Sequence, residues 1–142
     1  PHVRHSVPLW NIKELKDKSQ EEWTYRKYFM TQNYLFPCNF VQVMTDHVYV
    51  HSIIPTGPGT CVFKCMMLIS EPANTEKAQN YWEKNYNVVK EVFNEDFEIG
   101  EAIQAGLSTN ANDSFVFGKY ECGLHWGQKA IDDALDGRLK AS

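Results

Sequence analysis

The sequence predicts an α+β fold in which a curved antiparallel sheet is followed by a long helix. Residues 23–69 contain four short segments rich in Val, Ile, Phe, Tyr and Thr, which favour β-strands. The connections between them are short, as is typical of antiparallel neighbours, because parallel strands need long crossovers. After residue 75 the apolar residues recur about every 3.6 positions, which indicates helices. Strands followed by helices are the pattern of the α+β class.

Length and charge limit the classes of protein to be considered. The 142 residues are enough for one domain with a hydrophobic core, and we expect residues 1–142 to form a single domain. The net charge is −4 and no basic cluster occurs, so we expect no nucleic-acid partner. The apolar runs are far shorter than the roughly 20 residues of a membrane span, so we expect no membrane association.

The cysteines point to a reducing compartment. Cys38, Cys61, Cys65 and Cys122 form no Cys-x-x-Cys pair, and a chain of this size does not need disulfides for stability. We expect reduced thiols that pack as small hydrophobic side chains. The opening segment also lacks the apolar core of a signal peptide, so the expected location is cytoplasmic.

Four strands separated by short turns are predicted after a charged N-terminal segment. The opening PHVRHSVP is interpreted as the interior of a longer chain, and NIKELKDKSQEEW as a short charged helix or loop. Strands are expected in WTYRKYFM, NFVQVM, HVYVHSII and TCVFKCMMLI. Their separators FPCN, TD and PTGPG contain turn-forming residues, so a meander is predicted.

A long amphipathic helix is predicted from residue 76. Its apolar face consists of Ala78, Trp82, Val89, Val92, Phe93, Gly100, Ile103 and Leu107. Thr75 is expected to cap the helix and Gly106 to end it, with Asn94 as the start of a second segment if the helix kinks. The apolar face is expected to pack on the sheet.

A polar loop and a final helix complete the prediction. STNANDS is expected to form the loop. GLHWGQKAIDDALDGRL is expected to form an amphipathic helix in which Leu124, Ile131 and Leu135 face inward.

Asp96 raises the main functional question of the sequence. It falls on the same line of the helix as Val89 and Ile103, because seven residues make almost two turns. A carboxylate in an apolar interior is costly unless it is paired, hydrogen-bonded or bound to a metal. A structural partner or helix-capping role and a metal-ligand role therefore both stay open.

The other metal-binding residue types form weaker patterns. His47 and His51 lie four apart in a predicted strand, hence on one face, which would permit joint metal ligation but is also common without any such role. Cys122 and His125 form an isolated Cys-x-x-His pair. The glycine-rich nucleotide-binding, P-loop, Gly-x-Ser-x-Gly and His-Glu-x-x-His motifs do not occur.

Several stretches together resemble the C-terminal part of the catalytic domain of Rieske-type ring-hydroxylating oxygenase alpha subunits. They are YLFPCNFVQVMTDHVYVHSIIPTGPGTC, NEDFEIGEAIQAGL and GKYECGLHWGQKAIDDAL, in that order. The resemblance covers roughly residues 25–136 and depends on the order and spacing of these stretches. It implies a helix-grip, START-like fold, in which a curved sheet wraps a long helix and substrate lies between them.

The resemblance also implies a cofactor and an activity. In that family the long helix supplies one carboxylate to a mononuclear Fe(II) held by two histidines and a carboxylate, and Asp96 falls on that position. The implied reaction is hydroxylation by O₂ of an organic substrate, aromatic or a quaternary amine. Electrons would come from NAD(P)H through a reductase or ferredoxin and a Rieske [2Fe–2S] centre. Val89, Val92 and Phe93 are the candidates to line the substrate cavity, with core packing as the alternative role for each, and a homo-oligomer is expected.

The departures from the family pattern lead to a further expectation. The chain lacks the Cys-x-His half of the Rieske motif and the His-x-x-x-x-His run of the iron site. We therefore expect an incomplete catalytic domain without the Rieske domain, inactive by itself, as part of a larger oxygenase subunit. The alternative is a non-catalytic helix-grip module that binds an apolar ligand or a partner. A structural domain whose exposed sheet edge drives dimerisation is a third possibility.

Overall fold

The fold was obtained as a computed structural model that describes residues 1–112 and 114–139. The chain divides into two compact units. The first contains Pro1–Ser70 together with the segment that begins at Phe117, and the second contains Glu71–Val116. A five-stranded antiparallel sheet and a long C-terminal helix confirm the predicted α+β class and are consistent with a helix-grip fold.

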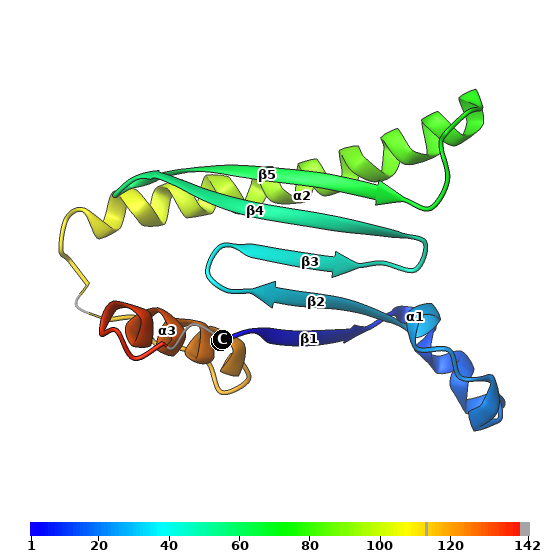
Figure 1. Cartoon of the computed structure of the whole chain (residues 1–142), viewed down its shortest axis with the longest axis horizontal. Helices are drawn as coiled ribbons and strands as arrows, with labels where there is room; N and C mark the ends of the chain where they lie inside the picture. The colour runs from blue at the N-terminus through cyan, green and yellow to red at the C-terminus, as the bar shows by residue number, and fades with distance from the viewer. Residues whose placement is uncertain (113, 140–142) are drawn as a thin grey trace. The chain divides into compact units, whose positions relative to one another are not determined.

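The sheet is a meander in which each strand pairs with its neighbours in sequence (Figure 1). All four pairings are antiparallel, as the short connections predicted. The strands are β1 (Val3–Pro8), β2 (Phe29–Leu35), β3 (Asn39–Val43), β4 (His47–Gly57) and β5 (Thr60–Ile69).

The N-terminal residues differ from expectation because they form a strand of the sheet. In β1 the apolar residues Val3 and Val7 lie on one face and are half-buried, whereas Arg4, His5 and Ser6 between them are exposed. The charged segment that follows forms the 3₁₀ helices η1 (Trp10–Asp17) and η2 (Gln20–Glu22), in agreement with the prediction of a short helix or loop.

The strand predicted from residue 23 begins later. The single helical turn α1 (Tyr25–Tyr28) comes first, and β2 starts at Phe29. The ring of Tyr25 stacks on that of Phe29 with centroids 4.8 Å apart, and the Tyr25 hydroxyl donates to Ser6 Oγ of β1. These contacts, one local and one to the distant strand β1, favour the turn over an extended chain.

The second unit contains the predicted long helix, α2 (Glu76–Leu107). Thr75 is confirmed as its N-cap, since the Thr75 hydroxyl accepts a hydrogen bond of 3.2 Å from the Ala78 N–H. The prediction of a second segment at Asn94 is wrong because the helix continues through it, and its end lies one residue after Gly106. The helix-favouring residues around Asn94, among them three glutamates, allow this continuity.

The final helix, α3 (Cys122–Leu135), contacts β1 (Figure 1). The prediction that Leu124, Ile131 and Leu135 face inward is wrong: all three are exposed, and Leu135 is 81% exposed. The buried residue is Ala130, and Gly127 on the same side is half-buried. The buried side of α3 is therefore not the side with the large apolar residues that the periodicity predicted.

None of the described helices has the length and apolar character needed to cross a membrane.

Candidate functional site

The predicted site residues lie together on α2. A stripe of less exposed side chains runs along this helix and consists of Ala78, Trp82, Asn85, Val89 and Phe93. Val89 and Phe93 belong to this stripe, whereas Val92 lies beside it and is exposed. Phe93 stacks with Phe97, with ring centroids 5.9 Å apart. An apolar surface therefore precedes Asp96 on the helix.

Asp96 differs from expectation in its exposure. Its side chain lies on the predicted line of α2 but is exposed, and no described residue of the helix is buried. An exposed carboxylate keeps its hydration, so Asp96 in this structure does not need the partner that a buried carboxylate would need. A metal-ligand role for Asp96 depends on its position in the family pattern.

The described residues do not form a complete metal centre. Among residues 1–112 and 114–139 no group of three or more His, Cys, Asp or Glu side chains lies close enough to hold one ion. The iron site implied by the resemblance needs two histidines and a carboxylate. Helix α2 contains Asp96 at the carboxylate position and has no histidine. The Cys122–His125 pair is exposed on α3 and belongs to no such group.

The two histidines of β4 lie on one face of the sheet, as their spacing predicted. His47 and His51 are both buried, with the buried ring of Tyr49 between them on the same face. His47 Nδ1 lies 2.6 Å from Asp46 Oδ1, and its ring meets the Tyr49 ring edge-on at 4.7 Å. His47, Tyr49 and His51 therefore form a packed row of rings on this face, which is a structural role for both histidines.

His51 is the centre of this row. Its ring stacks on Phe40 of β3 at 4.2 Å and on Phe63 of β5 at 5.4 Å. Burial lowers the pKa of His51 to about 4, so the ring is neutral at pH 7. Sequence reasoning missed this cluster because Phe40 and Phe63 come opposite or beside His51 only through the strand registers.

The neighbour of His51 on the other side is a thiol. Cys65 of β5 is directly opposite His51, and burial raises the pKa of the Cys65 thiol. A catalytic Cys–His pair needs a thiolate beside an imidazolium, whereas burial favours the neutral forms of both residues here. The pair therefore forms part of an uncharged wall, and the chemistry of a nucleophilic cysteine is not supported.

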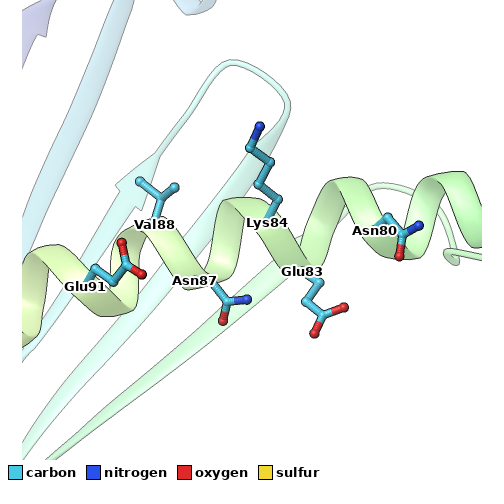
Figure 2. Close-up of a pocket in the computed structure, with 6 residues that line it drawn as sticks. All are labelled: Asn80, Glu83, Lys84, Asn87, Val88 and Glu91. Atoms are coloured by element: carbon cyan, nitrogen blue, oxygen red, sulfur yellow. The ribbon is translucent and has the colours of Figure 1, made fainter.

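A shallow hollow follows the polar side of α2 (Figure 2). It is lined by Asn80, Glu83, Lys84, Asn87, Val88 and Glu91. In Figure 2 Glu83 and Asn87 point away from Lys84 and Val88, so the polar groups do not converge on one point. None of the predicted site residues lines this hollow, and it has the character of a solvated helix surface.

The comparisons with known proteins identify the family. Residues 3–137 match the family described as the ring hydroxylating alpha subunit (catalytic domain). The chain is also 32% identical over 107 residues to Uncharacterized protein MJ0202 of Methanocaldococcus jannaschii, a match that covers 70% of this chain and 34% of the relative. The chain thus spans about a third of that relative's length. No solved structure matches the chain significantly. The match over nearly the whole sequence shows that the chain belongs to the family of ring hydroxylating alpha subunit catalytic domains.

Proposed function

We propose that the chain is the C-terminal part of the catalytic domain of a Rieske-type non-haem iron oxygenase. The observation that carries this proposal is the family match over residues 3–137. The family supports an oxygenase-type oxidoreductase in the intact protein. The finer proposal is hydroxylation by O₂ of an organic substrate, aromatic or a quaternary amine.

Asp96 is the carboxylate that this chain contributes to the iron site. It is positioned by α2, a continuous helix of 32 residues with a defined N-cap at Thr75. A carboxylate suits Fe(II), which when bound supplies the O₂ chemistry. The described residues contain no group of three candidate metal ligands, so the proposal assigns the two remaining ligands to the rest of the intact protein.

The residues before Asp96 contribute to substrate binding. Phe93, Val92 and Val89 lie three, four and seven positions before it, so they project from the same side of α2. Their apolar side chains suit the hydrocarbon part of a substrate and exclude water from it. The electron donors of the intact protein are a reductase or ferredoxin that draws on NAD(P)H, through a Rieske [2Fe–2S] centre outside this chain.

The test of the proposed function is the iron content of the intact protein. Asp96→Asn removes the anionic ligand and should lower bound iron at least tenfold, since even residues that support a ligand change affinity by about that factor. Glu95→Gln is the matched control, because Glu95 is also exposed but points about 100° away around the helix. Equal iron content in both variants would contradict the role of Asp96.

A non-catalytic module that binds an apolar ligand is the second candidate. The observation that favours it is the lack of a three-ligand group among the described residues, together with the uncharged aromatic row around His51. The two candidates differ in the intact protein. The oxygenase consumes O₂ in a substrate-dependent reaction, whereas the binding module does not.

A further inference from the structure

We draw no further inference here: the strongest candidate, the row of polar side chains that crosses the sheet from β1 to β4 on the face of His51 (His5, Gln32, Gln42 and Tyr49), carries nothing because the chain spans about a third of its relative's length and nothing in the structure shows whether a ligand or the rest of the intact protein covers this face.

Discussion

His51 lies directly opposite Cys65 in the β4–β5 pair, and burial favours the uncharged form of both side chains. The pKa of His51 falls to about 4, whereas that of the Cys65 thiol rises. With Phe40 and Phe63 stacked on the His51 ring, this face of the sheet is an uncharged aromatic surface. This aromatic surface stabilises the fold by packing. Protonation of the buried His51 ring lowers the stability of the fold.

The first prediction concerns the pH dependence of stability. The unfolded chain has the ordinary histidine pKa of about 6.5, so it binds more protons than the folded chain between pH 6.5 and 4. Folding stability should therefore fall as pH falls through this window, by up to about 3 kcal/mol from His51 alone. His51→Phe removes the titrating group, and urea unfolding of both chains at several pH values measures the difference. Parallel curves for the two chains would contradict this prediction.

The second prediction concerns the start of α2. Thr75→Ala leaves the Ala78 N–H without its side-chain acceptor and should lower the free energy of unfolding by about 1 kcal/mol. Thr75→Ser retains the hydroxyl and should change it by only a few tenths. Urea unfolding followed by circular dichroism distinguishes them. Equal losses for both variants would show that the methyl group, rather than the cap, stabilises this end.

The third prediction concerns the end of α3. Asp133 Oδ2 lies 2.5 Å from Lys129 Nζ, and Asp133 Oδ1 lies 2.8 Å from Arg138 Nη2. The hydrogen bond from Lys129 and, after it, the one from Arg138 lower the pKa of the Asp133 carboxyl. Asp133→Asn should lower the thermal midpoint slightly, and salt should abolish the difference. The stabilising effect of Asp133 is present above the ordinary carboxylate pKa of 3.8 and is lost as pH falls through the lowered value.

The control for this prediction is Asp132→Asn. Asp132 accepts a hydrogen bond of 3.0 Å from the neutral amide of Gln128, so screening by salt should affect it less. If the two variants respond alike to salt, the ion pairs of Asp133 do not stabilise α3.

The fourth prediction separates the two roles considered for Asp96. Because the side chain is exposed, Asp96→Ala in this chain should change the free energy of unfolding by no more than about 0.5 kcal/mol. A buried carboxylate with a structural partner would instead lose about 3 kcal/mol or more. Urea unfolding of the wild type and the variant measures the change. A loss of that size would favour the structural role over the metal-ligand role.

The periodicities predicted the elements that depend on local sequence. The β5 strand has the predicted bounds, β3 and β4 are close to them, and Thr75 caps α2 as expected. Strand β1 is not evident from the sequence because Arg4, His5 and Ser6 are polar and the strand ends in a proline, which gives a weak β-strand pattern. The four free cysteines agree with the prediction of reduced thiols, although Cys61 and Cys122 are exposed rather than packed.

Features that depend on contacts between distant segments were not predictable from local patterns. The side of α3 that is buried depends on how the helix packs in its unit, where it contacts β1, so the exposed positions of Leu124, Ile131 and Leu135 could not be predicted from a helical wheel. The cluster around His51 similarly requires the registers of three strands. The packing of α2 on the sheet, and with it the environment of Asp96 in the intact protein, stays a prediction.

The central claim is that Asp96 is one of three iron ligands of a larger oxygenase subunit. The most direct test is the DNA sequence immediately upstream of the codon for Pro1 in the source genome. The account predicts an open reading frame that encodes Cys-x-His and Cys-x-x-His pairs followed by a His-x-x-x-x-His run. A start codon directly before Pro1 would contradict the catalytic role, and the apolar-ligand module would then be the better account of this chain.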